Sequence, residues 1–312
     1  MKANTVKNNQ VHFKNFRDLA RAISLVENES PDAERILTEV FRYTGSAYRI
    51  GVTGPPGAGK STLVSQLVKN YRQQNIKIGI IAVDPTSPYS GGALLGDRIR
   101  MIDLINDPGV FIRSMATRGS LGGLSNKAQD VADLMDAAGM ELIIFETVGV
   151  GQGELDVAKA TDSTLVVLVP ESGDSIQAMK AGLMEIADIF VLNKSDRDGA
   201  EKMKIELEMM LQLKAPNPDW APPIIKTIAN KGEGIEELQN VVDKHRSVIQ
   251  KKGILKDKRT QRTREKIKEL IKLKLEQEFW TKDRTNLLEQ QLPHVLNQEL
   301  SPYKLSERLF DK

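Results

Sequence analysis

Seven short aliphatic runs divide the middle of this 312-residue chain, and amphipathic stretches of helix length separate them. Runs rich in Val and Ile with little polar alternation indicate strands that are buried on both faces, as in parallel sheets covered by helices. The pattern therefore predicts an α/β fold with a doubly wound, mostly parallel sheet. The runs read RIGVTG, KIGIIAVD, VFIRSMA, ELIIFETV, STLVVLVP, DIFVLNK and PIIKTIA.

Both ends of the chain have helical patterns instead. Near the N-terminus, Leu19, Ile23 and Val26 recur at helical spacing. After residue 250 the aliphatic runs stop, and residues 251–274 hold eleven Lys or Arg against three acidic residues. One face of this basic stretch is apolar, which is typical of a solvated helix that packs through one stripe; the stripe is Ile267, Leu270, Ile271 and Leu275. The predicted divisions are an N-terminal helical segment (1–46), the α/β domain (47–250) and a C-terminal helical arm (251–312).

The composition excludes several classes of function. A net charge of +2 with 28% charged residues gives no reason to expect nucleic acid or an anionic membrane as the main partner. The absence of cysteine excludes disulfides and thiolate metal sites, and the histidines, His12, His245 and His294, lack the spacing of metal ligands. No apolar leader is present and no aliphatic run is long enough to span a bilayer, so we expect a cytoplasmic protein.

The first aliphatic run leads into GPPGAGKS, which matches the pattern G-x-x-x-x-G-K-[ST]. It follows a predicted strand and precedes a stretch with helical periodicity, which is the context that a phosphate-binding P-loop requires. In such a loop the backbone N–H groups surround the β-phosphate, the lysine reaches the β and γ oxygens, and the hydroxyl binds Mg²⁺. Lys60 is thus a predicted catalytic residue. The predicted nucleotide-binding residues are Gly54, Pro55, Pro56, Gly57, Ala58, Gly59, Lys60, Ser61 and Thr62.

A second motif, Asn193-Lys194-Ser195-Asp196, follows the sixth run and indicates which base is bound. A carboxylate accepts hydrogen bonds only, and guanine offers Asp196 a pair of donors, N1–H and the 2-amino group, that adenine lacks. The next strand ends in Ile228-Ala229-Asn230, where GTPases usually present a backbone amide to guanine O6. The sequence therefore predicts GTP and GDP as ligands, bound by Asn193, Lys194, Asp196, Ile228, Ala229 and Asn230.

Three carboxylates and one hydroxyl form a candidate Mg²⁺ site. Glu146 lies in ETVG, where familiar GTPases carry D-x-x-G, and Asp84 and Asp97 follow the second run. Each carboxylate alone could be a turn residue or a helix cap. Together with Ser61 they form an oxygen-rich set that suits Mg²⁺.

The residue that orients the attacking water is not evident. Many GTPases have a glutamine directly after the segment equivalent to ETVG, but this chain has Val150 there, and Gln152 follows two residues later. The source of this group stays open, and we expect the isolated protein to hydrolyse GTP slowly.

Four segments in this order, GPPGAGKST, VDPTSPYSGGALLGDRIRM, ETVGVGQGE and VLNKSD, resemble the MeaB/ArgK family of P-loop GTPases. The resemblance spans essentially the whole chain, and DPTSPYSGGALLGDR is its most specific part because generic GTPases have nothing similar. It implies a homodimer, joined largely through the C-terminal arm, that acts as a chaperone of adenosylcobalamin-dependent methylmalonyl-CoA mutase. Such a chaperone gates cofactor delivery and protects or reactivates the mutase.

The same resemblance assigns roles to single residues. It implies that Asp84, Asp97 and Glu146 are the Mg²⁺ and switch carboxylates. It also implies that ESGDSIQAMK, which ends in Lys180, is a switch that responds to the partner. Glu146 and Lys180 thereby join Lys60 as predicted catalytic residues.

Other functions are also associated with P-loop proteins. A nucleotide-dependent kinase or ATPase of the amino-acid transport (LAO/AO) type, an older label within the same family, stays open, although the NKSD motif disfavours adenine. A scaffold that only binds GDP also stays open, because slow hydrolysis and pure binding look alike in sequence. A nickel-insertion GTPase would normally carry Cys or His ligands near its P-loop, which this chain lacks.

Overall fold

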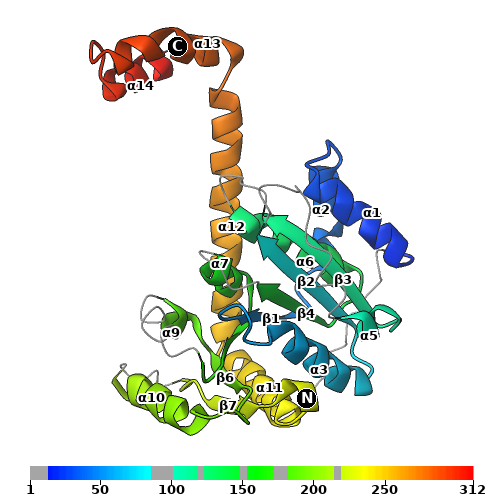
Figure 1. Ribbon diagram of the computed structural model, residues 1–312. Helices are drawn as coiled ribbons and strands as arrows, with labels where there is room; N and C mark the ends of the chain where they lie inside the picture. Colours follow the sequence, from blue (N-terminus) through cyan, green and yellow to red (C-terminus); the bar gives the residue numbers. More distant parts are fainter. Residues whose placement is uncertain are drawn as a thin grey trace. The chain divides into compact units, whose positions relative to one another are not determined.

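The computed structural model describes residues 13–85, 101–117, 123–147, 153–171, 182–213 and 219–311. The chain divides into two compact units, Met1–Arg259 and Thr260–Lys312. The first contains the sheet and most of the helices, and the second is helical (Figure 1).

One sheet of seven strands forms the centre of the first unit, in the order β3-β2-β4-β1-β5-β6-β7. All pairings are parallel, as the near-continuous aliphatic runs predict. Each of the seven runs forms a strand, so the predicted doubly wound α/β fold is confirmed. The strands are β1 (Tyr48–Thr53), β2 (Ile78–Pro85), β3 (Val110–Thr117), β4 (Leu142–Thr147), β5 (Ser163–Leu168), β6 (Ile189–Asn193) and β7 (Ile224–Thr227).

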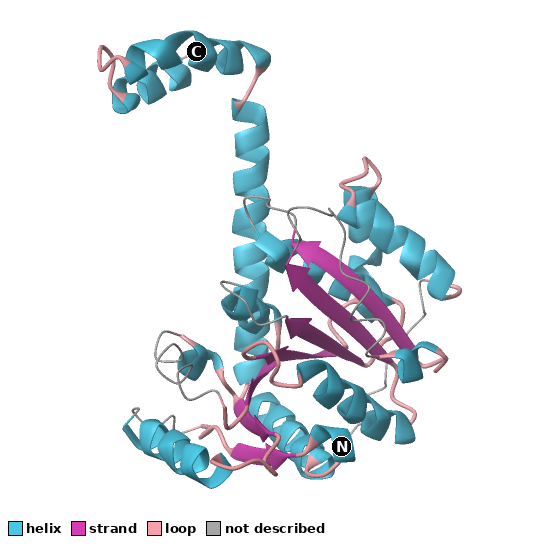
Figure 2. Ribbon diagram, viewed as in Figure 1, coloured by secondary structure: helices cyan, strands magenta, loops and turns pink. Residues whose placement is uncertain are grey.

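Helices cover both faces of the sheet (Figure 2). Successive side chains of a strand point to opposite faces, so on β4 Ile144 packs in the cluster with α3 and α11, while Phe145 packs in the cluster with α1 and α6. The helices of this unit are α1 (Phe16–Glu27), α2 (Ala33–Val40), α3 (Lys60–Gln73), α5 (Ile102–Ile105), α6 (Gly123–Ala137), α7 (Gly153–Ala160), α9 (Leu183–Ile186), α10 (Ala200–Leu213) and α11 (Ile235–Lys251), with the short 3₁₀ turns η1 (Phe41–Tyr43) and η2 (Ala229–Lys231).

The helical pattern near the N-terminus corresponds to α1. Leu19, Ile23 and Val26 are buried in the cluster that covers one face of the sheet. The helix starts where the Asn15 side chain accepts a hydrogen bond from the Asp18 amide at 3.0 Å, a typical N-cap. α1 packs against α6, and its Phe16 ring lies 5.3 Å from the Phe111 ring of β3.

The second unit contains most of α12 (Ile254–Phe279), with α13 (Lys282–Leu296) and α14 (Pro302–Phe310). Its small core consists of Leu300, Leu305 and Leu309, against which Phe279 of α12 and three residues of α13 pack: Leu287, Leu288 and Val295. The predicted apolar stripe of α12 lies outside this core, with side chains between 52% and 60% exposed: Ile267, Leu270, Ile271 and Leu275. Among the helices described, none has both the length and the apolar character needed to cross a membrane.

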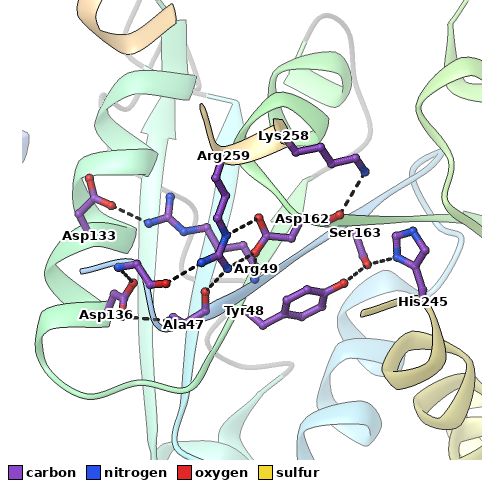
Figure 3. A network of polar contacts seen from close by, with 11 residues as sticks. Ala47, Tyr48, Arg49, Asp133, Asp136, Asp162, Ser163, His245, Lys258 and Arg259 are labelled. Carbon is purple, nitrogen blue, oxygen red and sulfur yellow. Dashed lines mark hydrogen bonds and ion pairs between the residues drawn. The ribbon is translucent and has the colours of Figure 1, made fainter. Parts of the chain in front are cut away.

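A buried polar network lies at the amino ends of β1 and β5, opposite the edge that carries the P-loop (Figure 3). Its histidine, His245 of α11, is 1% exposed. The His245 Nδ1 lies 2.5 Å from the Ser163 hydroxyl, Nε2 lies 3.5 Å from Asp188, and the ring packs 4.7 Å from Trp220. Burial lowers the pKa of His245 below its usual 6.5, although the nearby Asp188 carboxylate offsets part of this effect.

We expect the stability of the protein to fall as the pH drops below about 6.5. The unfolded chain protonates this histidine near that pH, whereas the folded chain protonates it only at lower pH. The unfolded state therefore binds more protons in this window, and the free energy of unfolding should decrease by up to about 1.4 kcal/mol per pH unit. Urea unfolding at several pH values between 7.5 and 5.5 would measure this decrease in the free energy of unfolding.

The matched variants are His245→Gln and His294→Gln. His294 lies in α13 with its side chain 53% exposed, so its replacement is the control for the loss of a histidine that is not buried. The His245→Gln protein should have a shallower slope over the same range, whatever its absolute stability. Equal slopes of the free energy of unfolding against pH in the parent and both variants would contradict the lowered pKa of His245.

Candidate functional site

The GPPGAGKS segment connects β1 to α3 at the centre of the sheet. Gly54 and Gly59 have φ values of +136° and +85°, a region that side chains other than glycine rarely adopt. A Cβ at Gly54 would lie 2.1 Å from the carbonyl oxygen of Val167, so the start of the loop packs directly on the backbone of β5. The loop therefore depends on its glycines for both its conformation and its fit against the sheet.

Lys60 and Ser61 are the first residues of α3, and both are 6% exposed. The Lys60 ammonium donates to the carbonyl oxygens of Gly54 and Pro55, at 2.7 and 2.9 Å. It is thus folded over the loop, within reach of the place where a P-loop holds phosphates. The positive end of α3 adds to the attraction for an anion.

Ser61 and Glu146 meet, as their predicted roles require. β4 pairs with β1 so that Glu146 lies opposite Val52, and the Ser61 hydroxyl donates to the Glu146 carboxylate at 2.5 Å. Glu146 is 5% exposed. A buried hydroxyl and carboxylate at a helix N-terminus are oxygen ligands of the kind that Mg²⁺ prefers, so these two residues fit the ion.

The other predicted members of this set are described less fully. Asp84 lies at the end of β2, where its backbone pairs with Ala116, and its side chain is outside the described part of the structure. Asp97 and Lys180 lie outside the described residues, as do Val150 and Gln152.

Asn193 connects three loops at the carboxyl edge of the sheet. It ends β6 and is 2% exposed. Its side-chain NH₂ donates to the Ala58 carbonyl in the P-loop at 2.8 Å. Its side-chain oxygen accepts from the Thr227 hydroxyl and the Ala229 amide, both at 3.1 Å. Lys194 adds a second tie to the P-loop, because its ammonium donates to Gly57 O at 2.9 Å.

The backbone of 228–230 is partly engaged within the protein. The Ile228 amide donates to Glu233 O at 3.1 Å, and the Ala229 amide donates to Asn193. Asn230 lies in η2 and is exposed. The segment thus lies at the carboxyl edge of the sheet beside the NKSD motif, with part of its backbone already hydrogen-bonded within the protein.

Asp196 is the most accessible residue of the NKSD motif. Its carboxylate is 40% exposed and lies 3.6 Å from the Lys231 ammonium. Sequence reasoning missed Lys231 and also Thr227, which positions Asn193. The available signal was their place directly before and after the Ile228-Ala229-Asn230 segment, since residues at the ends of parallel strands gather at one edge.

A parallel sheet whose central strand leads through a P-loop into a helix, with the NKSD motif at the same edge, defines a P-loop GTPase. Residues 19–284 match the family described as "Methylmalonyl Co-A mutase-associated GTPase MeaB". The chain therefore belongs to the MeaB family, and both the predicted resemblance and the predicted GTPase class are confirmed.

Relatives and solved structures agree with this membership. The chain is 46% identical over 303 residues to the protein PH0274 of Pyrococcus horikoshii, covering 95% of this chain and 94% of that protein. It is 35% identical over 293 residues to GTPase ArgK of Escherichia coli, covering 91% and 88%. A solved structure described as LAO/AO transport system kinase has a TM-score of 0.71 at 29% identity, covering 95% of this chain and 92% of the other.

Proposed function

We propose that the protein is a GTP-hydrolysing chaperone for an adenosylcobalamin-dependent acyl-CoA mutase of the methylmalonyl-CoA mutase type. In this proposal it gates delivery of the cofactor and protects or reactivates the mutase. The pairing of Ser61 with Glu146 beside the P-loop carries the hydrolytic part of the proposal. The family description, which names a mutase-associated GTPase, supports the partner.

The chain's own groups suit each part of the nucleotide. The P-loop amides and the Lys60 ammonium would hold the β and γ phosphates, with the ammonium leaving the carbonyl oxygens of Gly54 and Pro55. Ser61 and Glu146 would hold Mg²⁺, directly or through water, and the ion would neutralise charge on the phosphate oxygens. Asp196 would accept the two guanine donors, while Asn193 keeps the loops together.

The second unit supports a homodimer. Its core has three buried leucines, and half-exposed apolar side chains form a stripe along α12. An apolar helix face of this kind is stabilised when a second copy covers it. We therefore propose that this unit joins two chains.

The partner is tested by adding a purified adenosylcobalamin-dependent acyl-CoA mutase to a GTPase assay. The protein alone should turn over at about 10⁻⁴ to 10⁻² per second, and the mutase should raise this rate by acting on the predicted switch, residues 171–180. Lys180→Ala should reduce the stimulation more than it reduces the basal rate. Lys202→Ala, which changes an exposed lysine of α10 whose side chain is 83% exposed, is the matched control and should be stimulated like the parent.

Two outcomes would change the proposal. If Lys180→Ala is stimulated as strongly as the parent, then Lys180 has no part in the coupling. If neither protein responds to the mutase, the partner assignment loses its support. The alternative kinase function, which the solved relative described as LAO/AO transport system kinase favours, predicts transfer of labelled phosphate from GTP or ATP to a protein acceptor instead.

A further inference from the structure

The first turns of α12 are held on the first unit by one arginine. Arg259 donates to the Asp162 carboxylate through Nη2 at 2.7 Å and through Nε at 3.3 Å. It also donates to the carbonyl oxygens of Gly45, at 2.6 Å, and Ala47, at 2.8 Å. Asp162 directly precedes β5, and residues 45–47 directly precede β1, so one guanidinium spans the starts of two neighbouring strands (Figure 3).

These contacts form a partly buried polar junction, within the first unit, between the first turns of α12 and the starts of β1 and β5. Asp162 is fully buried, and its carboxylate also accepts from the Arg49 amide at 3.0 Å. Lys258 donates to the Asp162 carbonyl oxygen at 3.2 Å and pairs with Asp188 at the same distance. A buried carboxylate needs such partners, because removing one of them leaves a charge without compensation.

The phosphate loop lies at the other ends of the same two strands. β1 leads into Gly54, which packs so closely on Val167 of β5 that a Cβ would lie 2.1 Å from its carbonyl oxygen. The spacing of β1 and β5 is therefore fixed at one end by Arg259 and at the other end by the contact beneath the P-loop. Because packed strands have little freedom to deform, a change at either end affects the other.

A second connection runs through α7. This helix begins at Gly153, directly after the ETVGVGQ stretch, and ends two residues before Asp162. It packs tightly on β1, since a Cβ at Gly51 would lie 2.7 Å from Val157. Thr161 follows α7 and contacts the same glycine. A shift of α7 would thus move Asp162 and the guanidinium bound to it.

We propose that Arg259 is a positioning residue that couples the nucleotide site to α12. The bound nucleotide changes how tightly the first turns of α12 are held on β1 and β5, and by linkage the hold on α12 changes the preference for GTP over GDP. This inference rests on the guanine-nucleotide site proposed above and adds a second site that communicates with it.

A tryptophan of the chain can report this coupling. Trp220 donates through Nε1 to the Asp188 carbonyl oxygen at 2.7 Å, and Asp188 is the residue that Lys258 of α12 contacts. The chain has one other tryptophan, Trp280, in the second unit, so a Trp280→Phe protein gives fluorescence from Trp220 alone. The measurement compares this full-length parent with GDP and with a non-hydrolysable GTP analogue, each with Mg²⁺, while calorimetry gives both affinities.

The variants are made in the Trp280→Phe parent. Arg259→Gln should remove most of the difference in Trp220 emission between the two nucleotides and change the ratio of their affinities by about fivefold or more. Arg259→Lys should recover part of both effects, since lysine keeps the charge but cannot span Asp162 and two carbonyl groups. Arg264→Gln, further along α12, where the arginine donates to Gln261, should behave like the parent.

Because Arg259→Gln leaves the Asp162 carboxylate without its main partner, the double variant Asp162→Asn/Arg259→Gln removes both charges and gives the same measurement if the single variant fails to fold. A nucleotide response in the double variant equal to that of the parent would overturn the inference. So would calorimetric binding of both nucleotides by the parent without any change in Trp220 emission. If the parent binds no nucleotide, the proposed function falls together with the inference.

Discussion

Replacing Lys60 with Ala is expected to lower the rate of GTP hydrolysis by at least about 10²-fold, because the ammonium would no longer offset charge on the β and γ oxygens in the transition state. The side chain is positioned for this role at the start of α3, where it is held over the P-loop by the carbonyl oxygens of Gly54 and Pro55. Phosphate release at saturating GTP would measure the loss.

The control for this prediction is Lys69→Ala, on the same helix. Lys69 is 40% exposed and pairs with Asp103 at the surface, so its removal should leave the rate unchanged. Thermal unfolding of both variants would show that the fold is intact. Hydrolysis by Lys60→Ala at the parental rate would mean that the phosphates are held elsewhere.

Replacing Asp196 with Asn is expected to reverse the base preference. The carboxylate can only accept hydrogen bonds, whereas an amide can also donate one to the 2-oxo group of xanthine. Each hydrogen bond to a charged group contributes about 1.5–3 kcal/mol, so binding of GTP should weaken by at least about tenfold while binding of xanthosine triphosphate improves. Competition between the two nucleotides for the folded variant would measure the change.

The matched control is Asp198→Asn, two residues further along the same exposed loop. It removes the same charge from the same region, so it separates recognition of the base from a general electrostatic effect. Unchanged preference for guanine in Asp196→Asn would show that the NKSD motif does not read the base. The Lys231 ammonium, 3.6 Å from Asp196, would remain in place in both variants.

The parallel sheet and the edge that holds the candidate site follow from the sequence to a large extent. Near-continuous Val and Ile runs predicted parallel strands, and the carboxyl ends of parallel strands meet at one edge. Ser61 and Glu146, 85 residues apart, fall in one candidate metal set because ETVG stands where familiar GTPases carry D-x-x-G, and the structure brings the two side chains to 2.5 Å.

The contacts that hold the loops together could not be predicted in this way. Asn193 belongs to a motif that indicates guanine, but no spacing shows that its side chain faces the P-loop and the Thr227 hydroxyl. Arg259 lies in a run of basic residues that has the pattern of a solvated helix. Only the folded structure distinguishes Arg259 from the other basic residues of this run, because its partner Asp162 is 97 residues away in the sequence and is buried.

The hydrogen bonds of Asn193 also affect how binding energy is used. They join the phosphate loop to the segment that we propose reads guanine. When the two loops are already joined, nucleotide binding costs less conformational entropy of the protein than when two separate loops must first be ordered. More of the interaction energy is then left for the conformational change that we propose GTP drives in this protein.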